Sequence, residues 1–244
     1  GLFGTTIPEE YGGLGLGLDT YALIVMELSR GWVTLSGILN GSFIAATMIP
    51  SHGTEEQRQR FLPRLASGEI RSAFSMTEPH AGSDLKAIRT KAVRQGDHFV
   101  ISGQKVFISN GQSCDVLVLA TKTDSAAGAK GVTLFLVDTK TPGFRRGKNL
   151  NKLGMKGQDT SELFFDEMRV PASAMLGEEG KGFELMMTKL AQERLAQAIR
   201  SATVAETVVD YTVAYTAERK AFGKTIGDFQ NTQFKLAELR TEAV

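Results

Sequence analysis

The chain has 244 residues, of which 42% are hydrophobic and 23% charged, a composition typical of globular proteins with one to three domains. Its net charge of +1 gives no electrostatic reason to expect nucleic acid or a membrane surface as partner. One cysteine excludes an internal disulfide, and three scattered histidines argue against a metal site.

The first part of the chain has helical spacing of its apolar residues, from about residue 18 to 66. His52-Gly53-Thr54 predicts the end of one helix, and Thr54 with Gln57 predicts a capping box that begins another. Gly12 to Gly17 lacks the spacing of a dinucleotide fingerprint and follows no strand, so we interpret it as a flexible loop. We see no apolar run close to the roughly 20 residues of a membrane span.

From Arg71 to about Pro171 the pattern is typical of strands. The near-continuous apolar runs Val116–Ala120 and Val132–Val137 predict strands covered on both faces. Phe99–Ser102 and Lys105–Ser109 predict two strands joined by a two-residue hairpin turn, Gly103-Gln104. Leu163–Phe165 predicts a short further strand, and Arg145–Lys148 a solvated loop.

Helical spacing returns at Gly182 and continues to about Arg219, and a break at Phe222-Gly223-Lys224 leads to a last helix near Gln230. Strands and helices do not alternate, which argues against a doubly wound nucleotide-binding sheet. The expected domains are a helical domain at 1–70, a β domain at 71–175 and a second helical domain at 176–244. Neither end resembles a natural domain end, so we expect a chain truncated at both ends.

The most informative stretch is Met76-Thr-Glu-Pro-His-Ala-Gly-Ser-Asp84. It offers hydroxyls and small residues that let a backbone approach a flat ligand, although a capped turn has the same composition. Two later stretches accompany it, Lys105-Val-Phe-Ile-Ser-Asn-Gly111 and Arg219-Lys-Ala-Phe-Gly-Lys224 followed by Gln230. Together, in this order, they resemble the motifs of acyl-CoA dehydrogenases, particularly the long-chain and isovaleryl-CoA members.

The resemblance implies an α+β multidomain fold: a helical N-terminal segment, a central antiparallel β-barrel-like domain and the start of a C-terminal helical bundle. It also implies that the protein binds FAD. Thr77 and Ser109 would form hydrogen bonds to the flavin ring, and the side chain of Phe107 would cover the face of that ring. Arg219, Phe222 and Gln230 would meet the FAD of a neighbouring subunit in a homo-oligomer, expected to be a dimer of dimers. The implied FAD-binding residues are Phe74, Met76, Thr77, Gly82, Ser83, Phe107, Ile108, Ser109, Arg219, Phe222 and Gln230.

The catalytic base that the resemblance implies is Glu193, which follows Leu190 by three residues and Met186 by seven. It therefore lies on the apolar stripe of its helix, where a carboxylate is either paired with a cation or kept for function. The alternative is a structural Glu193 paired with an arginine such as Arg200. Ser83, Gln192, Glu193 and Arg194 are the implied substrate-binding residues.

The expected reaction is FAD-dependent desaturation of an acyl-CoA thioester to a trans-2-enoyl-CoA, with electrons passed to an electron-transfer flavoprotein. The alternatives are an acyl-CoA oxidase or flavin monooxygenase on the same fold, because a fold does not fix its chemistry. A further alternative is a fragment that binds flavin or acyl-CoA without catalysis. The expected location is a bacterial cytoplasm or a mitochondrial matrix, and acyl-chain length is left open.

Overall fold

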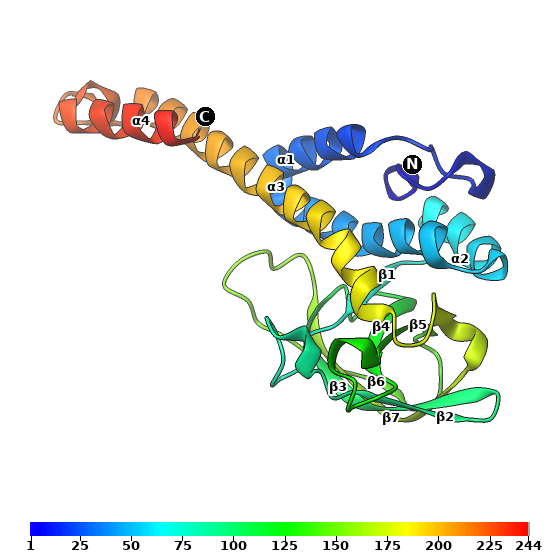
Figure 1. Cartoon of the computed structure of the whole chain (residues 1–244). Coiled ribbons are helices and arrows are strands. Elements are labelled where there is room, and N and C mark those ends of the chain that lie inside the picture. The colour runs from blue at the N-terminus through cyan, green and yellow to red at the C-terminus, as the bar shows by residue number, and fades with distance from the viewer. Residues whose placement is uncertain (244) are drawn as a thin grey trace.

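The computed structural model describes residues 1–243 and has the predicted order of helices, strands and helices (Figure 1). The first helices are α1 (Leu18–His52) and α2 (Glu55–Ser67). The predicted capping box is present, since Thr54 accepts a hydrogen bond from the Gln57 amide and Gln57 bonds back to the Thr54 N–H. α1 has non-helical dihedral angles at Trp32, so it consists of two helical halves.

α1 is also the one helix among the described residues that is long and apolar enough to cross a membrane, with a mean hydropathy of 1.4 over its best window. The sequence had given no such indication. Just over half of that window, 56%, is buried inside the protein. Met48 and Ile49 of α1 belong to the same apolar core as Val118 and Leu134 of the sheet, as expected of a core helix.

The β domain is one mixed sheet in the order β6-β7-β3-β2-β4-β5-β8, with β1 paired to β4. Most neighbours are antiparallel, but β1 and β2 each run parallel to β4. β4 and β5 are buried along nearly their whole length, because apolar clusters cover both faces, as predicted. The strands are β1 (Ser72–Ser75), β2 (Lys91–Gln95), β3 (His98–Ser109), β4 (Val116–Lys122), β5 (Val132–Asp138), β6 (Phe144–Asn149), β7 (Thr160–Pro171) and β8 (Met175–Leu176).

The predicted hairpin at Gly103-Gln104 was wrong, because β3 runs through both residues as one long strand. Gly103 marks a shift in the register between β3 and β7, and a Cβ there would overlap Thr90. The real two-residue turn is Gly96-Asp97 between β2 and β3, with Gly96 at a φ of 64°. Gly103, a glycine inside a strand pattern, therefore marked a β-bulge and the close packing of Thr90 against the backbone of β3.

Two further predictions for this domain need correction. Residues 145–148 belong to strand β6, and Arg146 donates to the carbonyls of Gly111 and Cys114 across the domain. The strand predicted at residues 163–165 is the middle of β7, which is twelve residues long. In both cases pairing with a neighbouring strand extends a weak local pattern.

The last part of the chain is α3 (Gly182–Glu218), a short hairpin of β9 (Lys220–Ala221) and β10 (Lys224–Thr225), and α4 (Gln230–Ala243). The N-terminal half of α3 crosses α1 above the β domain. Its C-terminal half projects away from the domain, and α4 folds back along it (Figure 1). The helix-breaking segment at residues 222–224 lies where the sequence predicted it.

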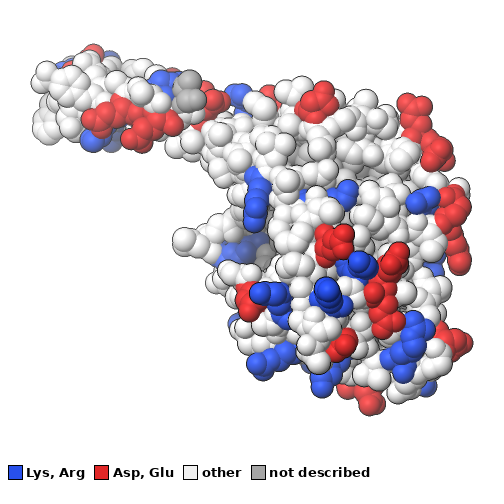
Figure 2. Space-filling model, in the orientation of Figure 1, with Lys and Arg blue, Asp and Glu red and all other residues white. Residues whose placement is uncertain are grey.

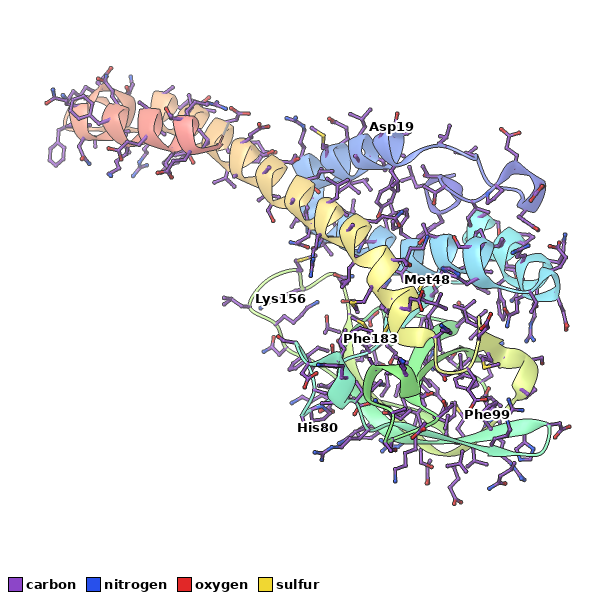
Figure 3. All side chains as sticks on the ribbon, in the orientation of Figure 1. Asp19, Met48, His80, Phe99, Lys156 and Phe183 are labelled. Carbon is purple, nitrogen blue, oxygen red and sulfur yellow. The ribbon has the colours of Figure 1, made fainter. Side chains whose placement is uncertain are left out.

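The crossing of α1, α3 and the sheet is the structural centre of the molecule. Met48 of α1 and Phe183 near the start of α3 lie at this junction, while Phe99 lies within the sheet (Figure 3). Two glycines of α1 allow this helix to pack closely against the β domain. A Cβ at Gly37 would overlap the side chain of Gln158, and a Cβ at Gly41 would overlap the side chain of Asn110. On the face that Figure 2 shows, acidic and basic side chains are interspersed over the sheet domain.

Candidate active site

A cavity of about 270 Å³ lies between α1, the β domain and α3. A narrower, apolar cavity of about 150 Å³ adjoins it, because Ile44, Phe74, Met76 and Glu193 line both. Met48, Met186, Met187 and Leu190 form most of the remaining wall of this apolar neck. The larger cavity is lined by Gly37, Asn40, Gly41, Ile44, Phe74, Met76, Thr77, Phe107, Ile108, Ser109, Gln158, Glu193, Gln197 and Arg200.

The β side of the larger cavity is a strained aromatic platform. Phe107 has a φ of 59°, and the register between β3 and β7 shifts between Lys105 and Ile108. A left-handed backbone is unfavourable for a phenylalanine, so its presence suggests a functional constraint. The bulge turns the ring outward, where it is 65% exposed, and half-buried Thr77 and Ser109 lie on the same wall. A flat ring with polar edges fits such a wall.

A buried ion pair supports this wall from behind. Lys105 is fully buried and donates to Glu78 Oε1 and to the Met76 carbonyl, both at 2.8 Å. Glu78 also accepts the backbone N–H groups of Arg89 and Thr90, at 2.6 and 3.0 Å. Burial lowers the pKa of Lys105 to about 8, and the adjacent Glu78 carboxylate opposes that shift. The pair fixes the loop that carries Thr77 to strand β3.

The opposite wall carries Glu193, held by a chain of hydrogen bonds from α1. Asn40 Nδ2 donates to Glu193 Oε2 at 2.8 Å, and the Tyr21 hydroxyl donates to Asn40 Oδ1 at 2.9 Å. Tyr21 is only 4% exposed and stacks on Phe43, with ring centroids 3.9 Å apart. The bond from Tyr21 occupies the amide oxygen, so the amide nitrogen faces the carboxylate.

Burial raises the pKa of Glu193, while the Asn40 hydrogen bond and the positive charge of Arg200 partly oppose this increase. No ion pair joins Glu193 to Arg200 or to any other cation within the described chain. The alternative interpretation, a structural Glu193 paired with an arginine, requires an ion pair that these residues do not form. A half-buried carboxylate with a raised pKa, opposite a polar-edged aromatic wall, is suited to general base catalysis.

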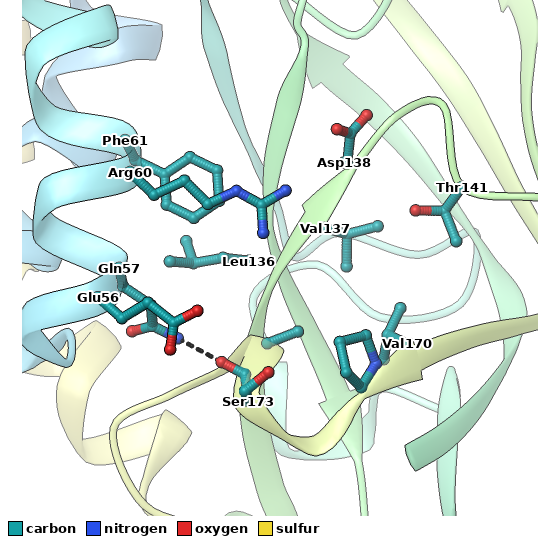
Figure 4. Close-up of a pocket in the computed structure, with 12 residues that line it drawn as sticks. Glu56, Gln57, Arg60, Phe61, Leu136, Val137, Asp138, Thr141, Val170 and Ser173 are labelled. Atoms are coloured by element: carbon teal, nitrogen blue, oxygen red, sulfur yellow. Dashed lines mark hydrogen bonds between the residues drawn. The ribbon is translucent and has the colours of Figure 1, made fainter. Parts of the chain in front are cut away.

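A separate cavity of about 170 Å³ lies between α2 and the sheet (Figure 4). Its position follows from the docking of α2, because Gln57 Nε2 donates to the carbonyls of Ser173 and Met175 there. It shares no lining residue with the cavity of Glu193. We assign it a structural role at the domain junction.

Three sequence profiles of one family match the chain in succession. They describe the N-terminal domain (residues 1–69), the middle domain (73–168) and the C-terminal domain (180–244) of acyl-CoA dehydrogenases. The chain belongs to the acyl-CoA dehydrogenase family. The resemblance drawn from its motifs is thereby confirmed, as is the expected fold class.

Individual members of the family support this assignment along the whole chain. The long-chain specific acyl-CoA dehydrogenase of Rattus norvegicus is 44% identical over 99% of the chain and 56% of its own length. The isovaleryl-CoA dehydrogenase of Pongo abelii is 41% identical over 99% of the chain and 58% of its length. The crystal structure of an acyl-CoA dehydrogenase from Geobacillus kaustophilus superposes with a TM-score of 0.95 at 46% identity, covering 99% of the chain and 64% of that structure.

The chain thus spans a little over half the length of these curated relatives. Within the part described, the cavity brings together many of the predicted residues. Those that line it are Phe74, Met76, Thr77, Phe107, Ile108, Ser109 and Glu193.

The other predicted residues lie elsewhere. Gly82 and Ser83 are exposed and line neither cavity, although they continue the loop of Thr77. Gln192 has a buried side-chain oxygen without a hydrogen-bond partner in the described chain, and Arg194 is exposed. Arg219, Phe222 and Gln230 lie on the projecting arm, far along the chain from the cavity wall of α3. Phe222 is almost fully exposed.

Sequence reasoning expected the first helices to contribute to the acyl pocket but named none of the residues of α1 that line it. Gly37, Asn40, Gly41 and Ile44 are spaced by three or four residues and form one stripe of the helix. Small residues repeated at this spacing are a signal of close helix packing. The polar Asn40 among them was the detectable clue to a buried polar contact. The ion pair of Glu78 and Lys105 was also missed, because lysine is ordinarily exposed in strands.

Proposed function

We propose that this chain provides the flavin-binding and substrate-binding core of an enzyme that converts an acyl-CoA thioester to a trans-2-enoyl-CoA. The observation that carries the proposal is the position of the Glu193 carboxylate. It shares one cavity with Thr77, Phe107 and Ser109, the residues expected at a flavin ring. Its raised pKa suits a base that works near neutral pH.

The residues of the β wall fit FAD. Phe107 offers an exposed aromatic face, and Thr77 and Ser109 offer hydroxyls and backbone groups at its edges. Bound there, the flavin supplies the two-electron acceptor that takes a hydride from the β-carbon of the acyl group. The residues of this chain hold the ring and the thioester on opposite sides of the same small space.

In this proposal Glu193 removes a proton from the α-carbon, and a carbon–carbon double bond forms as the hydride departs. The methionine-lined neck beside Glu193 excludes water and keeps the carboxylate a stronger base than it is in solution. Asn40 holds the carboxylate in one orientation, which limits its motion before the reaction. Electrons then pass to an electron-transfer flavoprotein.

We further propose that the projecting arm serves a neighbouring subunit. Arg219, Phe222 and Gln230 are placed to meet the FAD of that subunit in a dimer of dimers, which would account for the exposure of Phe222. On the substrate side, Ser83 is proposed to contact the CoA portion, and Gln192 and Arg194 are proposed to bind the substrate beside Glu193. The pool of acyl-CoA would be that of a bacterial cytoplasm or a mitochondrial matrix.

Anaerobic mixing of the FAD-loaded full-length protein with acyl-CoA thioesters tests the proposal. We expect bleaching of the flavin, and Glu193→Gln should slow it about 10³-fold, within the 10²–10⁴ typical of a positioned base. Glu69→Gln is the matched control, because Glu69 lines neither part of the cavity and its exposed side chain pairs with Arg64. A Glu193→Gln protein that is reduced at the normal rate would place the base elsewhere.

The electron acceptor is tested separately. With an electron-transfer flavoprotein as acceptor, turnover should proceed without consumption of oxygen. Rapid oxygen consumption during turnover would instead favour an acyl-CoA oxidase or a flavin monooxygenase. A protein that binds FAD and acyl-CoA but never bleaches would be the non-catalytic alternative.

A further inference from the structure

One buried cation at the cavity has no partner. Arg200 lies on α3 seven residues beyond Glu193, which places it about 10.5 Å further along the helix axis. It is only 9% exposed, yet it lines the cavity. Its Nε is closed off from solvent without a hydrogen-bond partner, and no hydrogen bond or ion pair to its guanidinium occurs within residues 1–243.

The two groups whose charges act on Arg200, Tyr21 and Glu193, are both hydrogen-bonded to Asn40. Glu193 accepts from Asn40, and the Tyr21 hydroxyl donates to the same amide. Glu193 is close enough to act on Arg200 through its charge but makes no ion pair with it. Burial lowers the pKa of Arg200, as expected of a cation without a neutralising contact. A buried charge of this kind is costly unless a ligand neutralises it.

The two ends of the combined cavity differ in their side chains. Half-buried Lys189 lines the apolar neck, and its charge acts on His52, which lines an open surface hollow. The charged residues of that hollow are Glu178, Lys181 and Glu184. The other end carries Arg200, which is itself buried, with exposed Gln197 beside it.

A CoA moiety is large and carries phosphates that must stay in water, so it fits the open hollow on the side of the neck where Lys189 lies. In this arrangement the thioester enters past the neck, and its acyl group points toward the part of the cavity that Arg200 lines. That end terminates at Arg200 instead of at apolar side chains. A saturated hydrocarbon tail gains nothing from a desolvated guanidinium, whereas a carboxylate forms a strong charge-assisted pair with it.

Resting on the proposed function, we propose that Arg200 binds a carboxylate at the far end of the acyl group, so that the preferred substrates are CoA thioesters of dicarboxylic acids. Gln197 lines the same stretch of wall, one helical turn nearer to Glu193. Arg200 then acts as a specificity-determining residue, because an acyl-CoA without the terminal carboxylate leaves the cation unpaired.

The test compares matched thioesters on the FAD-loaded full-length enzyme: adipoyl-CoA against hexanoyl-CoA, and suberoyl-CoA against octanoyl-CoA. We expect the dicarboxylic member of at least one pair to have a kcat/KM about 10-fold or more above its partner, the size expected of one hydrogen-bonded charge pair. Arg200→Met should abolish this preference by lowering the rate with the dicarboxylic thioester. Arg200→Lys should retain part of it, and Arg64→Met on α2, far from the cavity, should leave it unchanged.

A binding measurement on the Glu193→Gln protein, in which turnover is blocked, provides a readout independent of activity. Adipoyl-CoA should bind about 10-fold more tightly than hexanoyl-CoA, and Arg200→Met should equalise the two affinities. Equal binding of both thioesters in the presence of Arg200 would overturn this inference and leave the proposed function intact. Loss of both activities alike in Arg200→Met would also overturn it, because Arg200 would then act on Glu193 or on CoA. A protein that binds no acyl-CoA at all would overturn the proposed function too.

Discussion

Replacing Asn40 with leucine tests whether α1 controls the carboxylate of Glu193, the proposed catalytic base. The side chains have similar size, so the change removes the donor at 2.8 Å from Glu193 Oε2 without opening a large cavity. The Asn40 hydrogen bond favours the charged form of Glu193 and opposes the effect of burial. Without it, the pKa of Glu193 should rise further above its ordinary value.

The expected loss of rate in Asn40→Leu follows from the strength of the hydrogen bond between the Asn40 amide and the charged Glu193 carboxylate. A hydrogen bond to a charged group contributes about 1.5–3 kcal/mol. Glu193 must be deprotonated to accept the substrate proton, so the fraction of active enzyme falls at any pH below its pKa. We therefore expect flavin reduction on the acid side of the pH profile to slow roughly 10- to 100-fold.

The assay is the rate of anaerobic flavin bleaching by one acyl-CoA, measured in single turnovers from acid to alkaline pH. The acid limb of the profile should move to higher pH in Asn40→Leu, and the rate should recover toward the normal plateau at high pH. Tyr21→Phe is the companion variant, because it removes only the hydroxyl that orients Asn40. It should move the limb in the same direction by a smaller amount.

An Asn40→Leu profile that keeps its acid limb in place would refute the reasoning, since the contact would then not stabilise the carboxylate. A uniform loss of rate at all pH values would also contradict it, because that pattern indicates lost substrate binding or a distorted cavity. Circular dichroism and flavin content would confirm that the variant is folded and loaded before either conclusion is drawn.

Two further predictions concern the β wall. Phe107→Gly should stabilise the apoprotein by up to about 1 kcal/mol in thermal unfolding, because glycine adopts the left-handed backbone without strain, yet it should weaken FAD binding in a fluorescence titration. Unchanged FAD affinity would contradict the role of the ring. Lys105→Met should lower the free energy of unfolding in urea by about 3–5 kcal/mol, since it leaves Glu78 buried without its cation. Adding Glu78→Gln should restore part of the loss, and two additive losses would argue against a coupled pair.

Local pattern in the sequence determined most of the secondary structure. The capping box at Thr54, the buried strands of the sheet and the break before Gln230 each depend on residues close together in the chain, so their periodicity and turn chemistry were visible. Glu193 was identified from the family resemblance, and its position on an apolar helical stripe agreed with that identification. The failures, such as the hairpin placed at Gly103, came where pairing with a distant strand overrode local preference.

The chemistry of the cavity depends on contacts that no local pattern contains. Asn40 and Glu193 are 153 residues apart, and Lys105 reaches Glu78 across 27 residues. The sequence by itself determined that a carboxylate on α3 and a motif loop in the β domain were present. Only the tertiary structure decided which residues of α1 complete their cavity and that Arg200 faces it without a partner among residues 1–243. The reason is physical: the burial and pairing of a polar side chain depend on which distant segments pack around it, and the packing belongs to the whole fold.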